Sequence, residues 1–222
     1  MIIIFDLDDT LYEEMTFVKE GFKAVSIFLK DYLEDKPELI YDELIKIHER
    51  EGRGKIFDHL LEKRNKLKKN IIAKCISIYR YHKPKIKLND DALCFLKKNK
   101  GRPLYLVTDG NKNVQANKVE ALNLKRWFSK IFITHRYGIK SAKPSLYCFE
   151  KIKDKEKCNW KDLVYIGDNP SKDFVSLKKV EAKTIRVLTG NYSTKLVSEE
   201  YDADLKINSL SELESSLGKI FN

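Results

Sequence analysis

The sequence predicts an α/β fold: a parallel β-sheet with helices on both faces, interrupted after its first strand by a purely helical insertion. Two observations indicate this fold. Short apolar runs without alternation recur along the chain, which is typical of strands covered on both faces. Segments with helical periodicity lie between most of these runs, as in sheets built from strand–helix–strand units. A chain of 222 residues is long enough to bury a substantial core around such a sheet.

The first expected strand covers residues 2–5, where the letters IIIF form an unbroken apolar run. The other expected strands lie at 103–107, 130–133 and 163–166, with weaker candidates at 183–187 and 203–207. Helical patterns follow at 112–122, 145–153, 171–180 and 209–217. This alternation predicts a parallel sheet that lies between two layers of helices.

Residues 14–84 break this alternation, because they contain four helical patterns and no strand pattern. Turns are expected between these helices at KPELI (36–40) and EGRGK (51–55). A helix at 89–99, with Asn89 as its N-cap, then leads back into the sheet. We therefore expect two domains, an α/β core formed by 1–13 and 85–222 and a helical domain formed by 14–84.

The net charge of +10 is the one compositional feature that could indicate a partner, because basic surfaces attract nucleic acid and anionic lipid. The densest basic run, KRNKLKKN at 63–70, lies in a helical pattern without interleaved aromatic residues. A solvated helix face is the better interpretation, so nucleic acid is an unlikely partner. No apolar run approaches the length of a membrane span and no signal peptide is visible, which favours the cytoplasm.

Polar residues gather where the expected strands end. Ligands of open parallel sheets bind outside the carboxyl ends of the strands, so these positions are the candidate site. They are Asp6, Asp8, Thr108, Asp109, Lys143, Asp168 and Asp173. Taken singly, an aspartate at a strand end is most often a turn or capping residue. Lys143 is one of 43 basic residues, so its residue type alone does not indicate a function. The functional interpretation depends on their combination, because each of them stands at the end of an expected strand or start of an expected helix of the core.

The pair Asp6 and Asp8 suits phosphoryl chemistry. Their spacing of two places both side chains on the same side of an extended chain, whereas Asp9 should point outward and do no chemistry. One carboxylate can attack a phosphoryl group while the other donates and later accepts a proton. Asp168 would complete an oxygen-rich site for Mg²⁺, and Thr108 with Lys143 would neutralise the phosphoryl oxygens. Lys143 is preferred to Lys140 because Pro144 follows it at an expected helix start.

The ordered motifs IIIFDLDDT, LYLVT, AKP and YIGDNPSKD resemble those of the haloacid dehalogenase superfamily. The first and last are specific, and the middle two are weak alone. The resemblance implies a Rossmann-like core with an inserted all-α cap. It implies Asp6 as nucleophile, Asp8 as general acid and base, Asp168 with Asp6 as metal ligands, and a metal contact from the Asp8 backbone carbonyl. Asp173 would serve the metal site or orient Lys143, and Thr108, Asp109 and Lys143 would bind the phosphate.

A Mg²⁺-dependent hydrolase of small phosphomonoesters, such as sugar phosphates or nucleotides, is the function that this resemblance implies. Dehalogenases lack the second acid, and transporting ATPases need membrane helices. A phosphomutase is the alternative within the superfamily, and a non-catalytic nucleic-acid or protein binding module is the alternative from another class. The chain could be a monomer or a homodimer.

Specificity should reside in the helical domain, because the core motifs reach only the phosphate and the bridging oxygen. Arg53, in the EGRGK turn, is the candidate for reading the leaving group. Its planar donor fork suits carboxylates and hydroxyls, and the flanking glycines permit a tight backbone. The alternative is an exposed turn with an incidental arginine.

Overall fold

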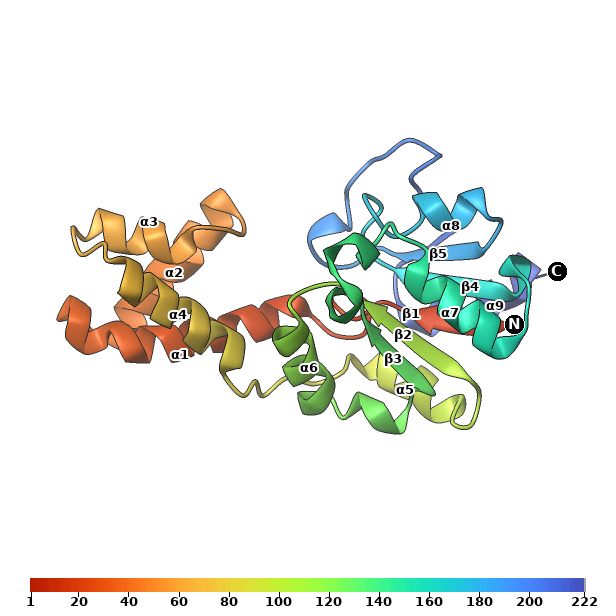
Figure 1. Ribbon diagram of the computed structural model, residues 1–222, viewed down its shortest axis with the longest axis horizontal. Coiled ribbons are helices and arrows are strands. Elements are labelled where there is room, and N and C mark those ends of the chain that lie inside the picture. Colours follow the sequence, from red (N-terminus) through yellow and green to blue (C-terminus); the bar gives the residue numbers. More distant parts are fainter. Residues whose placement is uncertain (222) are drawn as a thin grey trace. The chain divides into compact units, whose positions relative to one another are not determined.

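The computed structural model describes residues 1–221, and the chain divides into two compact units. The core unit combines residues 1–14 with the chain from Ile86 onward, and the helical unit covers residues 15–85. Figure 1 shows the sheet of the core unit and the helices of the helical unit. Within residues 1–221, no helix combines the length and the apolarity that a membrane span requires.

The core unit contains a six-stranded, fully parallel sheet with the order β3-β2-β1-β4-β5-β6. Its strands are β1 (Ile2–Phe5), β2 (Leu104–Thr108), β3 (Lys130–Ile133), β4 (Leu163–Gly167), β5 (Lys183–Val187) and β6 (Leu205–Ile207). The expected α/β fold is therefore confirmed, and both weak strand candidates form. The chain proceeds from β1 outward to β3, then returns to the other side of β1 with β4. The strand order thus reverses at β1, and such a switch point is where open α/β sheets bind ligands.

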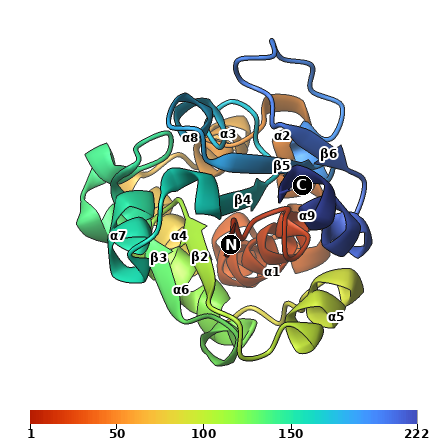
Figure 2. The ribbon, with the colours of Figure 1, turned by 90° about the vertical axis from the view of Figure 1, so that its right-hand side faces the viewer.

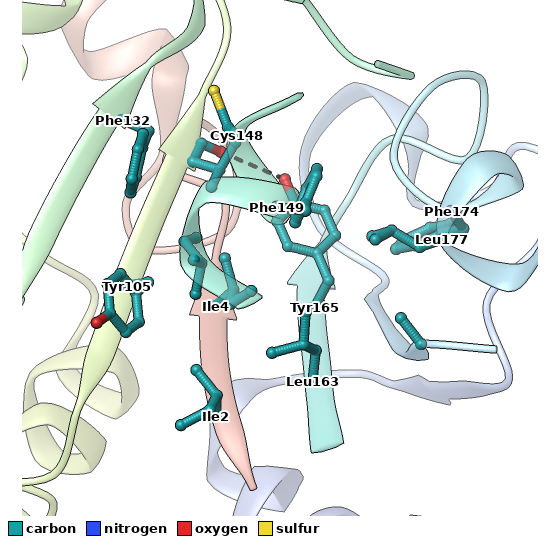
Figure 3. Packing of buried hydrophobic residues seen from close by; sticks show 13 residues of the cluster. Ile2, Ile4, Tyr105, Phe132, Cys148, Phe149, Leu163, Tyr165, Phe174 and Leu177 are labelled. Carbon is teal, nitrogen blue, oxygen red and sulfur yellow. Dashed lines mark hydrogen bonds between the residues drawn. The ribbon is translucent and has the colours of Figure 1, made fainter. Parts of the chain in front are cut away.

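One face of the sheet is covered by α7 (Tyr147–Glu156) and α8 (Val175–Lys179). Figure 3 shows this cluster, in which Ile2 and Ile4 of β1 lie on the same face of the sheet as Tyr105 of β2 and Tyr165 of β4, with Phe132 of β3 farther out. The rings of Phe149 and Tyr165 meet edge to face with their centroids 5.0 Å apart. Burying side chains of this size stabilises the fold by about 1.5–3 kcal/mol each.

The opposite face carries α5 (Asp90–Lys98) and α9 (Leu213–Phe221), and Figure 2 shows them across the sheet from α7. The ring of Phe95 packs against Phe5, with centroids 5.6 Å apart. Asn89 occupies the N-cap position of α5 as expected, but its side chain makes no capping hydrogen bond. Asp91 in the first turn instead accepts from the backbone N–H groups of Ala92 and Leu210, which ties α5 to the segment before α9.

Residues 15–85, with Glu14, form the four expected helices and no strand. They are α1 (Glu14–Leu33), α2 (Pro37–Glu51), α3 (Ile56–Lys63) and α4 (Lys69–Tyr81). Their apolar faces share one buried cluster that includes Phe22, Leu44, Leu60 and Cys75.

Two expectations about the helical unit are wrong. The turn expected at 36–40 is mostly helix, because Pro37 begins α2 at a position where its missing N–H and fixed φ cost nothing. The basic run at 63–70 is not one helix face: only its ends lie in α3 and α4, and residues 64–68 form the mostly exposed connection between them. The turn at 51–55 is present, and its glycines adopt φ values of 70° at Gly52 and 117° at Gly54.

Helices of the core unit also depart from their expected bounds. The helix expected at 171–180 shrinks to α8, because the preceding residues turn around the buried Asp173. The helix expected at 209–217 begins as a 3₁₀ turn over Leu210–Glu212 and continues as α9. The helix expected at 112–122 is α6 (Lys112–Ala121), capped by Asn111, whose side chain accepts from the N–H groups of Asn113 and Val114.

Candidate active site

Three neighbouring strands deliver the predicted polar residues to one edge of the sheet. Asp6 follows β1, Thr108 ends β2 and Asp168 follows β4, and β1 lies between the other two strands. The Asp6 N–H still donates to the Ile166 carbonyl at 2.8 Å, so the sheet ladder holds the backbone that carries this carboxylate. All three residues are buried. The switch point of the sheet thereby becomes a polar site with little access to bulk water.

Lys143 is the cation at the centre of this site. Its Nζ lies 2.9 Å from Asp6 Oδ1 and 2.8 Å from Asp173 Oδ1, and it donates to the Tyr165 hydroxyl at 2.7 Å. Figure 3 shows Tyr165 rising from β4, with its hydroxyl directed at the Val107 carbonyl. The two carboxylates outweigh the effect of burial and hold the pKa of Lys143 well above its usual value. The ammonium is therefore a permanent positive charge beside Asp6.

The geometry also distinguishes Lys143 from Lys140. Lys143 is buried, whereas Lys140 is exposed on a 3₁₀ turn. The helix start expected at Pro144 is wrong, because no helix begins at this residue. The Lys143–Pro144 peptide is cis, and α7 begins only at Tyr147.

Both carboxylate oxygens of Asp173 have protein partners. Oδ1 faces Lys143, and Oδ2 accepts from the Asn169 N–H at 3.0 Å. Gly167 makes this approach possible, since a Cβ there would lie 2.6 Å from Asp173 Oδ2. Asp173 is thus placed to orient Lys143 and the loop that carries Asp168.

The carboxylates of Asp6, Asp168 and Asp173 fit a small divalent cation. Each offers an oxygen that lies within 4.8 Å of the other two. Burial, with the neighbouring acids, raises the pKa of Asp168 to about 9. Burial likewise raises the pKa of Asp6 to about 7, although Lys143 opposes it. Three carboxyl groups share the single ammonium of Lys143, so the ionised cluster keeps an excess of negative charge on hard oxygen ligands, which is the setting in which Mg²⁺ binds.

Asp8 turns away from this cluster toward a second buried cation. Its Oδ1 lies 2.7 Å from Lys118 Nζ and accepts from the Tyr12 hydroxyl at 2.6 Å, while Oδ2 accepts from Gln115 Nε2 at 2.9 Å. Burial alone would raise the pKa of Asp8, but Lys118 and the three hydrogen bonds hold it below the usual value. The side chain of Asp8 is not a member of the acidic cluster, so any metal contact of this residue would come from its backbone carbonyl.

Thr108 and Asp109 link the site to its surroundings. Thr108 Oγ1 accepts from Gln115 Nε2 at 2.6 Å. Asp109 accepts from Thr134 Oγ1 at 2.7 Å, from the Lys143 N–H at 3.1 Å and from Lys172 Nζ at 3.2 Å. Burial would raise the pKa of Asp109, but Lys143 and Lys172 lower it. Asp109 thus holds the loop that carries Lys143 in place through these hydrogen bonds. Its expected contact with substrate stays a prediction.

Asp9 does not point outward as expected. It is buried, with a left-handed backbone at φ 52°, a conformation that aspartate tolerates better than most residues. Its Oδ1 accepts from the Glu14 N–H at 2.9 Å, and the Thr189 hydroxyl donates to its carbonyl. A Cβ at Gly190 would lie 2.1 Å from Asp9 Oδ2, so this glycine is required for the fit. Asp9 shapes the turn after β1 without entering the acidic cluster.

Arg53 belongs to the helical unit, where it is exposed on the loop between α2 and α3. Its expected part in substrate recognition stays a prediction.

Sequence reasoning missed five polar residues that the structure brings to the site. They are Tyr12, Gln115, Lys118, Tyr165 and Lys172. One signal could have found two of them: Gln115 and Lys118 stand three positions apart, on one face of the helix that follows Thr108, together with the apolar Val119. Polar residues on the apolar face of a helix require buried partners.

Comparison with known proteins agrees with this geometry. Residues 3–187 match the family of haloacid dehalogenase-like hydrolases. A glyceraldehyde 3-phosphate phosphatase of Methanocaldococcus jannaschii is 31% identical over 220 residues, 95% of this chain and 94% of that protein. A protein of the same name from Pyrococcus furiosus is 26% identical, over 96% of this chain and 90% of its own.

Solved structures share the fold at low sequence identity. A HAD phosphatase from Thermococcus onnurineus has a TM-score of 0.62 at 21% identity, covering 98% of this chain and 97% of its own. The magnesium-bound HAD-hydrolase YfnB of Bacillus subtilis has a TM-score of 0.70 at 18% identity, over 97% of both chains. The family match spans most of the sheet and includes every predicted residue of the core site, and the chain belongs to the haloacid dehalogenase-like hydrolases.

Proposed function

We propose that this chain is a Mg²⁺-dependent phosphatase that hydrolyses a small phosphorylated metabolite through an aspartyl phosphate on Asp6. The observation that carries the proposal is the buried trio at the switch point: the Asp6 carboxylate, the Lys143 ammonium 2.9 Å away and the Asp168 carboxylate of the acidic cluster. In this proposal Asp6 is the nucleophile, Lys143 the phosphate-binding cation and Asp168 a metal ligand. Family membership and the phosphatase names of the curated relatives support the same activity.

The substrate we propose is a small phosphate ester of the size of a triose phosphate. The relatives that match nearly the whole of this chain are named glyceraldehyde 3-phosphate phosphatases. The core side chains to which the proposal gives a role, Asp6, Thr108 and Lys143, would contact only the phosphoryl group, so they would not select the leaving group.

In the first half-reaction, a carboxylate oxygen of Asp6 attacks phosphorus and the bond from phosphorus to the leaving oxygen breaks. Lys143 and the Thr108 hydroxyl face the phosphoryl oxygens and stabilise their charge. Mg²⁺, when held by Asp6 and Asp168, supplies further positive charge there. Asp8 passes a proton to the leaving oxygen, which departs as an alcohol. This proton arrives with the substrate, because a phosphomonoester monoanion still carries one near its second pKa of about 6.

In the second half-reaction, Asp8 takes a proton from a water molecule as that water attacks the phosphorus of the aspartyl phosphate. The acyl phosphate bond breaks, and Asp6 is restored as a carboxylate beside inorganic phosphate. Asp8 then releases its proton to bulk water and returns to the ionised state. Lys118 suits Asp8 to this task, because it keeps the resting group in its basic, ionised form. The two acids thus divide nucleophilic and proton-transfer work between them.

A panel of phosphomonoesters tests the proposal. The purified chain is incubated with Mg²⁺ and glyceraldehyde 3-phosphate, glycerol phosphate, phosphoglycolate, a hexose phosphate, a nucleoside monophosphate or p-nitrophenyl phosphate, and released phosphate is measured. We expect turnover that is highest with the smallest natural esters and lost in Asp6→Asn, a nearly isosteric change. Absence of phosphate release from every ester would contradict the proposal.

A further inference from the structure

We propose that Lys118 is a positioning residue that, with Gln115, holds the Asp8 carboxylate in place for proton transfer to the leaving oxygen. The inference rests on the proposed phosphatase activity and deepens it, because it assigns work to two residues of α6 that lie outside the recognised motifs.

Lys118 is not an incidental surface lysine, since only 3% of the residue is exposed. Its Nζ lies 2.7 Å from Asp8 Oδ1 and 3.3 Å from Glu14 Oε1. An ammonium that leaves water for such a site is tolerated only when it is paired with anions. The site therefore contains two buried lysines, each of which joins two acids: Lys143 joins Asp6 to Asp173, and Lys118 joins Asp8 to Glu14.

Three donors fix the orientation of the Asp8 carboxylate. Lys118 and the Tyr12 hydroxyl both reach Oδ1, and Gln115 Nε2 reaches Oδ2. Because the donors lie on both oxygens, rotation of the carboxylate breaks hydrogen bonds in a buried place, where unpaired groups are costly. Asp8 is thereby held by its own cation, separate from the Lys143 cation that serves Asp6.

Gln115 also connects Asp8 to Thr108. Its Nε2 donates to Asp8 Oδ2 at 2.9 Å and to Thr108 Oγ1 at 2.6 Å, which uses both N–H bonds of the amide. Since Thr108 Oγ1 accepts this bond, its own O–H is left to donate to another group, as a phosphate-binding hydroxyl must. Glycine suits position 110, because its φ of 133° is one that other residues rarely adopt and a Cβ there would make a tight contact, 3.3 Å from the Gln115 side chain.

The effect of positioning Asp8 on the rate should depend on the leaving group of the ester. An alkoxide needs a proton to depart, whereas p-nitrophenolate departs as an anion. A group that positions Asp8 therefore matters for alkyl phosphates in the first half-reaction and hardly matters for p-nitrophenyl phosphate. When phosphoryl transfer from the substrate to Asp6 is irreversible, kcat/KM reports only the first half-reaction.

The test compares Lys118→Met with the wild-type chain on glycerol phosphate and on p-nitrophenyl phosphate, with Mg²⁺ present. We expect kcat/KM to fall about 100-fold for the alkyl ester, within the range of general acid catalysis, and less than about tenfold for the aryl ester. The matched control is Lys125→Met, which removes an exposed lysine paired with Glu120 and should change neither value. Equal losses on both esters would overturn the positioning role.

A double-mutant cycle with Asp8→Asn separates positioning from general destabilisation. If Lys118 acts through Asp8, adding Lys118→Met to Asp8→Asn should lower kcat/KM for glycerol phosphate by less than about threefold. A further loss of about 100-fold would overturn the inference. Should Lys118→Met fail to fold, Lys118→Gln supplies the same two-ester comparison, because it also removes the ammonium while leaving Gln115 and Thr108 unchanged. A wild-type chain that hydrolyses neither ester would instead overturn the proposed function itself.

Discussion

Without a bound metal ion, the core unit should lose stability as the pH rises, because Asp168 must give up its proton inside a buried acidic cluster. Burial and the neighbouring Asp6 and Asp173 raise the pKa of Asp168 from 3.8 to about 9. A group whose pKa is raised on folding contributes stability that is complete below the unfolded value and is lost as the pH rises through the folded value. The loss should therefore extend from about pH 4 to about pH 9.

The magnitude follows from proton linkage. Between about pH 6 and about pH 8 the unfolded carboxyl is ionised while the folded one keeps its proton, which costs about 3 kcal/mol at 1.36 kcal/mol per pH unit. For chains of this size each kcal/mol shifts Tm by about 2–4 °C, so Tm should fall by about 6–12 °C over that interval. Mg²⁺ compensates the ionised carboxylates, so the Tm gain that it provides should grow over the same interval.

Thermal melts in excess EDTA and in saturating Mg²⁺ measure both effects. Asp168→Asn is the matched control, because its amide is neutral at every pH of the series. We expect the variant in EDTA to show a smaller decrease of Tm than the wild-type chain, and its Tm gain from Mg²⁺ to be lost. If wild type and variant in EDTA share the same pH dependence, the buried-charge reasoning is refuted.

Three further results are expected. Asp8→Asn should lower kcat for alkyl phosphates by about 10²- to 10⁴-fold, and unchanged turnover would exclude Asp8 as acid and base. Excess chelator should abolish phosphate release, and a Mg²⁺ titration should show Asp168→Ala weakening metal affinity more than Asp173→Ala, because Lys143 already engages Asp173. Arg53→Ala should lower kcat/KM for the best natural substrate and leave p-nitrophenyl phosphate hydrolysis unchanged, whereas a uniform loss would exclude a role in reading the leaving group.

The strands and their terminal polar residues could be predicted because both are local features of the sequence. The unbroken run at 2–5 indicates a central strand by itself, and the residue after it must then lie at the carboxyl end of the sheet. The same reasoning predicts Asp6, Thr108 and Asp168 at one edge of the sheet, where the structure has them.

The remaining features depend on tertiary contacts that a local pattern does not contain. Lys118 and Gln115 matter because α6 places them against Asp8, more than 100 positions earlier in the chain. Asp9 is buried because the Gly190 loop closes over it. The basic run at 63–70 follows a helical pattern, but α3 ends at Lys63 and the exposed basic residues make the connection.

The most direct test of the central claim is to locate the phosphorylated residue. With p-nitrophenyl phosphate as substrate, the Asp8→Asn variant should accumulate the aspartyl phosphate, because formation from this ester needs no proton from Asp8 whereas breakdown uses Asp8 as the base. Acid quenching during turnover, followed by borohydride, reduces an acyl phosphate to an alcohol, so peptide mass spectrometry should find homoserine at position 6. Substrate-dependent reduction at any other position, or an unmodified Asp6 in the quenched variant together with full turnover by Asp6→Asn, would contradict Asp6 as the nucleophile.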